Sequence, residues 1–76
     1  MSRAIHSPPY RKLRQSLMGA RIESGLTQTQ VAVKLKRPQS FVSKYESGER
    51  QLDAVEFAKV CQVLGVKPGT ILDTLF

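Results

Sequence analysis

GLTQTQVAVKLKRPQSFVSKYESG, residues 25–48, decides the fold, because it encodes two short helices separated by a turn. The first helix starts at Thr27. With Gln30 three positions later, Thr27 matches a capping box, in which side chains at a helix start bind its free backbone amides. Apolar residues then recur at helical spacing: Val31, Ala32 and Leu35. We therefore predict a short helix over 28–35 that ends near Lys36.

A second short helix follows after a turn of a few residues. Pro38 suits a helix entrance, where the missing N–H of proline does no harm, and Ser47 with Gly48 closes the helix. Its apolar residues are Phe41, Val42 and Tyr45. Two helices joined in this way are what a helix-turn-helix requires. The first, 28–35, would brace against the DNA backbone, and the second, Pro38 to Glu46, would enter the major groove.

The sequence before this segment predicts one longer helix. Ser7 followed by two prolines marks its start, and apolar residues recur from Leu13 to a stop at Gly25. Residues 1–6 have no apolar pattern, so we expect them to be a flexible tail or an arm that touches DNA.

Two more helices are predicted downstream. A second capping box, Asp53 with Glu56, opens the first of them, and Gly65 ends it. A last helix from Pro68 carries four apolar residues: Ile71, Leu72, Leu75 and Phe76. The expected fold is therefore all-α, a compact five-helix bundle with a central helix-turn-helix, and residues 7–76 are expected to form a single domain.

Length and composition exclude several classes of protein. With 76 residues, the chain can hold one domain and has no room for a separate ligand-binding domain. No apolar run approaches the roughly 18 residues that a membrane span requires. One cysteine, Cys61, and one histidine, His6, form neither a disulfide nor a cysteine-based metal site, so Cys61 is expected in the core. We expect no cofactor, no metal and no secretory leader, and hence a cytoplasmic, nucleoid-associated protein.

The charge of the chain favours a polyanionic partner. The formal net charge is +6, from 12 Lys and Arg against 6 Asp and Glu. Through Arg50 there are ten basic and three acidic residues, which gives +7, whereas two basic and three acidic residues follow, which gives −1. The binding surface is therefore expected on the first two thirds of the chain.

Catalysis is not expected, because the acidic residues are scattered and no nucleophile stands with a base. Two other functions remain open beside binding to duplex DNA. One is a protein-interaction module of the same fold, such as an antitoxin-like or assembly partner, although the basic first part of the chain argues against it. The other is RNA binding, which is disfavoured because few exposed aromatic residues are available to stack on bases.

Three groups of residues keep a fixed order and spacing: Gly25-Leu26-Thr27-Gln28, then Val31-Ala32, then Gln39-Ser40-Phe41-Val42-Ser43-Lys44-Tyr45-Glu46-Ser47-Gly48. They resemble the signature of the XRE family, the Cro and phage-repressor type of helix-turn-helix, and the similarity runs from about Leu13 to Leu75. The resemblance implies a five-helix bundle that binds a specific double-stranded DNA operator, approximately palindromic, as a homodimer. It also implies transcriptional control, most often repression.

The resemblance also assigns roles to individual residues. It places five side chains at positions that contact bases: Gln39, Ser40, Phe41, Ser43 and Lys44. Gln39 would bind adenine through its amide, and Phe41 would either touch a thymine methyl group or pack against the turn. Phosphate contacts are expected from Gln28, at the start of the bracing helix, and from basic residues that flank the recognition helix: Lys36, Arg37 and Arg50.

The turn departs from the family pattern, because Lys36 replaces the usual glycine and Pro38 replaces a common Ser or Thr cap. Lysine adopts the left-handed conformation of that glycine only at a cost of order 1 kcal/mol, so either the helix over 28–35 ends differently or a DNA contact by Lys36 compensates the cost. Arg21 and Glu46 match positions that commonly form an ion pair, with a phosphate contact by Arg21 as the alternative. The C-terminal end often forms the dimer interface in the family. Four apolar residues here either form that interface or complete the core: Ile71, Leu72, Leu75 and Phe76.

Overall fold

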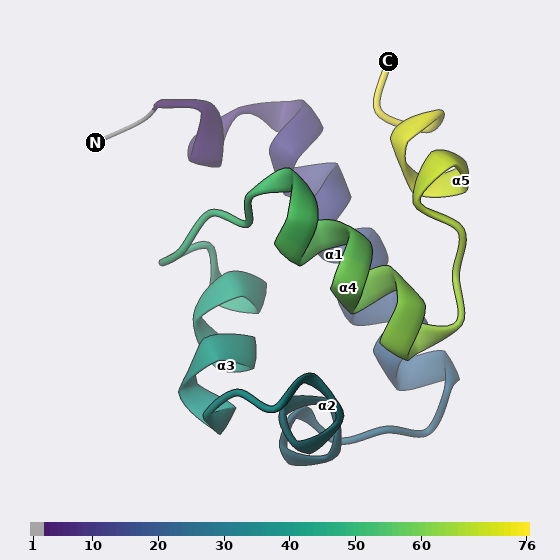
Figure 1. Cartoon of the computed structure of the whole chain (residues 1–76). Helices are drawn as coiled ribbons and strands as arrows, with labels where there is room; N and C mark the ends of the chain where they lie inside the picture. Colours follow the sequence, from purple (N-terminus) through teal and green to yellow (C-terminus); the bar gives the residue numbers. More distant parts are fainter. Residues whose placement is uncertain (1–2) are drawn as a thin grey trace.

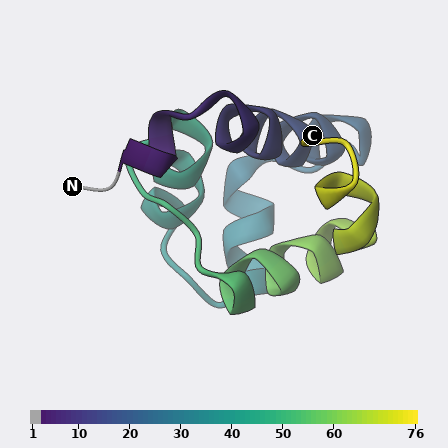
Figure 2. The same cartoon turned by 90° about the horizontal axis from the view of Figure 1, so that it is seen from above.

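The computed structural model describes residues 3–76, and every regular element over that range is a helix. A short 3-10 helix precedes five α-helices, which are η1 (Arg3–His6), α1 (Pro8–Glu23), α2 (Gln28–Leu35), α3 (Gln39–Ser47), α4 (Ala54–Leu64) and α5 (Pro68–Leu72). Helices α1 and α4 pack against each other, with α2 and α3 on one side and α5 on the other (Figure 1, Figure 2). The predicted five-helix, all-α architecture is therefore confirmed.

Both predicted capping boxes are present. The Thr27 hydroxyl accepts from the Gln30 N–H at 3.0 Å, while the Gln30 side chain accepts from the Thr27 N–H at 2.8 Å. The Asp53 carboxylate accepts from the Glu56 N–H at 2.7 Å, and the Glu56 carboxylate accepts from the Asp53 N–H at 3.0 Å. These bonds satisfy amides that would otherwise lack partners, so the starts of α2 and α4 are set locally.

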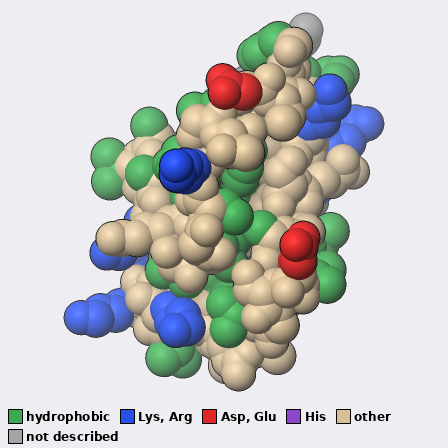
Figure 3. Space-filling view, turned by 90° about the vertical axis from the view of Figure 1, so that its right-hand side faces the viewer, with side chains coloured by type: hydrophobic (Ala, Val, Ile, Leu, Met, Phe, Trp, Pro, Cys, Tyr) green, Lys and Arg blue, Asp and Glu red, His purple; other side chains and the backbone are tan. Residues whose placement is uncertain are grey.

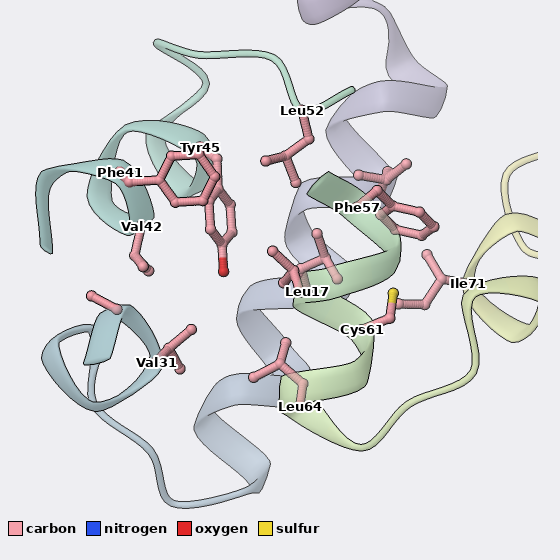
Figure 4. Close-up of a cluster of buried hydrophobic side chains, with 13 residues drawn as sticks. Leu17, Val31, Phe41, Val42, Tyr45, Leu52, Phe57, Cys61, Leu64 and Ile71 are labelled. Atoms are coloured by element: carbon pink, nitrogen blue, oxygen red, sulfur yellow. The ribbon is translucent and has the colours of Figure 1, made fainter. Parts of the chain in front are cut away.

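The core joins the two helices of the helix-turn-helix to α1 and α4. Figure 4 shows Val31 from α2 and Val42 and Tyr45 from α3 in one buried cluster that also contains Leu17 of α1. These four side chains have no exposed surface. Because burial of a large apolar side chain contributes about 1.5 to 3 kcal/mol, this packing holds α2 and α3 in one relative orientation.

Lys36 ends α2 in the left-handed conformation, with φ 57° and ψ 42°. The N–H groups of Lys36 and Arg37 donate to the carbonyls of Val33 and Ala32 at 3.1 and 3.0 Å. This is the Schellman arrangement that glycine usually completes. Among residues 3–76, Lys36 is the only residue other than glycine with positive φ, so α2 ends as it would with the usual glycine and does not end differently.

Pro38 caps α3 with extended backbone and without a side-chain hydrogen bond, so the recognition helix begins at Gln39, one residue later than expected. The last helix is shorter than expected, because α5 ends at Leu72 and the chain continues in tighter turns. There the N–H groups of Thr74 and Leu75 each donate to the carbonyl three residues back, at 3.1 and 3.2 Å.

The expected tail is structured over part of its length. Residues 3–6 form η1, and Ile5 is only 6% exposed because it packs into the molecule. The signal for this element is a single apolar residue, which forms no periodic pattern. Residues 1–2 of the expected tail lie outside the described residues. No helix within the described chain has the length and apolar character needed to cross a membrane.

Candidate nucleic-acid interface

The exposed face of α3 carries the polar residues that the sequence assigned to base contacts. Gln39, Ser40 and Lys44 are exposed and Ser43 is partly exposed, whereas Val42 and Tyr45 on the opposite face are fully buried. The helix therefore presents short polar side chains to solvent over its first two turns. A helix of this kind fits the major groove, where base edges offer hydrogen-bond donors and acceptors.

Phe41 is an exception among the five expected base contacts, because it is buried to 7% exposure. Its ring lies edge-on to Tyr45, with the two ring centroids 5.6 Å apart. The guanidinium carbons of Arg37 and Arg50 lie 4.4 and 4.9 Å from the ring centroid. The structure therefore favours the packing alternative, because core residues and two arginines cover most of Phe41 and leave little surface for a thymine methyl group.

A chain of hydrogen bonds links Gln39 to the protein interior. The Gln39 Nε2 donates to Gln28 Oε1 at 2.8 Å, and the Gln28 Nε2 donates to Glu46 Oε1 at 2.9 Å. A carboxylate only accepts hydrogen bonds, so Glu46 dictates which end of the Gln28 amide faces it, and Gln28 in turn orients the Gln39 amide. One N–H and the oxygen of Gln39 remain for a base, which is the pattern that adenine accepts.

The expected ion pair between Arg21 and Glu46 anchors this chain. Arg21 Nε and Nη2 donate to the two Glu46 oxygens at 2.7 and 3.1 Å, and Arg21 Nη1 donates to the Leu26 carbonyl at 3.0 Å. The Glu46 side chain is 3% exposed and the Arg21 side chain 14%. The hydrogen bond to Glu46 raises the pKa of the Arg21 guanidinium above its usual value. A bidentate pair of this kind ties α1 to the end of α3.

Arg14 is a structural residue that the sequence analysis missed. Its Nη1 donates to the Glu46 carbonyl at 3.1 Å, and its guanidinium lies against Gly48, where an added Cβ would stand 3.1 Å from the Arg14 Cζ. Gly48 also has φ +86°, a conformation that favours glycine. The glycine was visible in the sequence, but the close approach of Arg14 depends on the crossing of α1 and α3.

The expected phosphate contacts are less uniform than the sequence suggested. Lys36 is exposed at the turn, but Arg37 and Arg50 both pair with Glu56, a residue expected only to cap α4. Arg50 binds both Glu56 oxygens at 2.8 Å, and Arg37 binds Oε2 at 3.0 Å. Hydrogen bonds from Arg50, together with the Asp53 N–H, lower the pKa of Glu56 to about 2, so Glu56 is ionised at neutral pH.

The four C-terminal residues assigned to a dimer interface differ in exposure. Ile71 is 6% exposed and belongs to the core, and Leu75 is partly buried against it. Leu72 is 46% exposed and Phe76 is fully exposed. Figure 3 shows the side of the molecule on which α5 lies, where hydrophobic side chains are interspersed with lysine and arginine side chains. Only part of the predicted set is therefore free for another molecule.

The described residues include no group of three or more His, Cys, Asp and Glu side chains placed to hold a metal ion. Cys61 lies in the core, as expected, and burial raises the pKa of its thiol. A buried thiol of raised pKa is a poor nucleophile, so it acts as a small apolar side chain.

Comparisons with known proteins agree with this geometry. A family model described as helix-turn-helix matches residues 17–71. A solved structure of an XRE-family like protein from Pseudomonas syringae pv. tomato str. DC3000 is 44% identical, with a TM-score of 0.87 over 95% of this chain and 88% of that one. A Yarrowia lipolytica protein, by its name a multi-protein-binding factor 1, is 38% identical over 53 residues, which are 70% of this chain. The chain spans about a third, 35%, of that protein's length.

Proposed function

Because this chain belongs to the XRE-type helix-turn-helix family, a family of DNA-binding regulators rather than enzymes, we propose that it reads a specific operator sequence in double-stranded DNA through α3. The proposed output is transcriptional repression, by covering a promoter. The site of action is the nucleoid in the cytoplasm.

One observation carries this proposal, the directed chain of hydrogen bonds from Gln39 through Gln28 to the buried Glu46. A side chain whose amide is oriented before binding loses less conformational entropy when it meets a base, so the contact contributes more to selectivity. Ser40, Ser43 and Lys44 extend the same exposed face of α3. Phe41 is not part of the base-reading set.

Phosphate contacts position the recognition helix without reading sequence. Helix α2 would approach the DNA backbone with its N-terminus, where Gln28 lies, since free N–H groups and the helix dipole favour an anion. Lys36, Arg37 and Arg50 would add phosphate contacts on either side of α3.

We also propose a two-fold homodimer on an approximately palindromic operator, because one recognition helix reads too few base pairs to define a single site in a genome. The exposed Leu72 and Phe76 support an interface near α5, with the edge of Leu75 contributing. Sedimentation equilibrium of the wild type and of Leu72→Asp tests this. Dimers that are lost in the variant support the interface, while a monomeric wild type on operator DNA or unchanged dimers in the variant refute it.

The function is tested by selecting bound duplexes from a random pool. The affinity of Gln39→Ala is then measured for the selected DNA and for unrelated DNA. We expect the variant to lose about 1 to 3 kcal/mol of discrimination, because a bidentate base contact is worth that much, with little loss of non-specific affinity. Ser47→Ala, at the far end of the exposed face, is the matched control. Equal losses on both DNAs would make Gln39 a backbone contact, and recovery of no preferred sequence would reject an operator.

A protein-interaction module is the second candidate, favoured by the name of the Yarrowia relative, a multi-protein-binding factor. The same duplex titrations at low salt separate the two. Duplex binding with a recovered operator supports the regulator. Absence of duplex binding, together with capture of a defined protein partner, supports the interaction module.

A further inference from the structure

Glu56 is shared by the two arginines that flank the recognition helix. Each of its oxygens accepts two hydrogen bonds. Oε1 accepts from Arg50 Nη1 at 2.8 Å and from the Asp53 N–H at 3.0 Å, and Oε2 accepts from Arg50 Nη2 at 2.8 Å and Arg37 Nη2 at 3.0 Å. The carboxylate is therefore saturated, since its two oxygens offer about four acceptor positions. Glu56 carries one negative charge, whereas Arg37 and Arg50 together carry two positive charges.

The arginines have a second support that does not depend on Glu56. Both guanidiniums stack on Phe41, at 4.4 and 4.9 Å from its centroid, and that ring is fixed by its burial in the core. Their side chains remain 44% and 39% exposed, so each guanidinium also reaches solvent. Phe41 positions the two cations, while Glu56 offsets their charge and occupies their donors.

We propose that Glu56 limits the affinity of this protein for duplex DNA, because its carboxylate competes with DNA phosphate for Arg37 and Arg50. The inference rests on the proposed DNA-binding function and adds a residue outside the helix-turn-helix that tunes it. Since phosphate contacts carry no base information, the limit applies to every duplex alike.

Two opposing effects decide the direction of the change when Glu56 is lost. Loss of the carboxylate frees arginine donors and removes a negative charge from a neighbourhood in which Lys59 is also present. It also removes bonds that order the two side chains. The Phe41 ring continues to hold both guanidiniums, so the loss of order is small and the release of charge prevails. Affinity for DNA should therefore rise.

The test is Glu56→Gln, which removes the charge but keeps an oxygen for the Asp53 N–H, since glutamine also completes a capping box. Asp73→Asn is the matched control, because it makes the same change in charge after α5, on the side of the bundle away from α3 (Figure 1). Since Asp73 follows Leu72 of the proposed dimer interface, sedimentation equilibrium establishes that this control keeps the oligomeric state of the wild type. Affinities for one operator duplex and one unrelated duplex are measured between 50 and 200 mM salt, and circular dichroism establishes that each variant is folded.

We expect Glu56→Gln to bind both duplexes more tightly by roughly two- to fivefold, which corresponds to the contribution of a partly exposed ion pair. The salt slope should stay close to that of the wild type, because Arg37 and Arg50 contact phosphate in both proteins and only the wild type must first break their bonds to Glu56. Asp73→Asn should stay close to the wild type, since charges beyond about 10 Å are screened at 0.1 M salt. Unchanged or weaker binding by Glu56→Gln, or an equal gain in Asp73→Asn, overturns the proposal.

A measurement on the wild type keeps the inference testable if Glu56→Gln does not fold. The side-chain N–H resonances of Arg37 and Arg50 should shift when duplex is added, because phosphate replaces carboxylate, while those of the internal Arg21 should shift less. Unchanged Arg37 and Arg50 resonances at saturating duplex overturn the proposal. A wild type that binds no duplex at low salt instead rejects the proposed function, and the inference with it.

Discussion

Breaking the Arg21–Glu46 pair should destabilise the fold even without DNA, and the two single variants should differ. Arg21→Ala leaves a carboxylate that is 3% exposed with Gln28 as its remaining side-chain donor. The loss of one partner of a buried pair costs about 3 to 5 kcal/mol, and we expect a value in this range. Glu46→Ala leaves a guanidinium that is 14% exposed and keeps the Leu26 carbonyl, so we expect about 2 to 3 kcal/mol.

Thermal denaturation followed by circular dichroism provides the measurement. In a domain of this size a loss of about 3 kcal/mol lowers the melting temperature by roughly 12 to 24 °C. Arg11→Ala, on the exposed surface of α1, is the control and should change stability by less than about 0.5 kcal/mol. The double variant leaves neither charge unpaired, so it should be more stable than the sum of the two single losses predicts, by about 1 to 3 kcal/mol. Additive losses, or equal stability of all variants, would refute the reasoning.

Three further predictions concern the recognition helix and its flanks. Gly48→Ala should lower the melting temperature, because φ at Gly48 is +86° and the new Cβ meets Arg14 at 3.1 Å. Gly19→Ala, in open space within α1, should instead raise stability by about 0.5 to 1 kcal/mol. Equal effects of the two substitutions would contradict this prediction. Glu56 has a lowered pKa of about 2, so its contribution to stability should be present above pH 4.5 and be lost as the pH falls toward 2. Acid titration of wild type and Glu56→Gln checks this, and an equal pH dependence would exclude Glu56 as the cause. Lys36→Ala should weaken binding to all duplexes and flatten the salt slope by about 0.9, whereas a loss on one sequence alone would make Lys36 a base contact.

The helix boundaries were largely predictable, because they depend on residues close together in the chain. Thr27 with Gln30 and Asp53 with Glu56 form their capping boxes within a single helical turn, so the same few residues decide both the pattern and the structure. The end of α3 at Gly48 is local for the same reason. The short η1 helix was not predictable, because Ile5 is one apolar residue whose burial depends on packing against the rest of the molecule.

The candidate site was predictable in its residue types but not in its partnerships. The positions of Gln28, Gln39, Arg21 and Glu46 came from the family resemblance, which also predicted the pairing of Arg21 with Glu46 but not the hydrogen bonds of Gln28. The link from Gln39 through Gln28 joins α3 to α2, and it forms only because the turn brings their N-termini together. The burial of Phe41 could not be predicted from the sequence, because it depends on where the side chains of Arg37 and Arg50 lie.

The sequence by itself determined the five α-helices, the presence of a turn between α2 and α3, the excess of basic residues before Gln51 and the family of the fold, because these depend on local spacing and on composition. Tertiary structure alone decided the role of Glu56. Nothing in a capping box indicates that its carboxylate will also pair with Arg37, which is 19 residues away, and with Arg50. Those pairs arise because α4 packs beside the turn and the end of α3, and the energy of an ion pair depends on distances in space that no local pattern encodes.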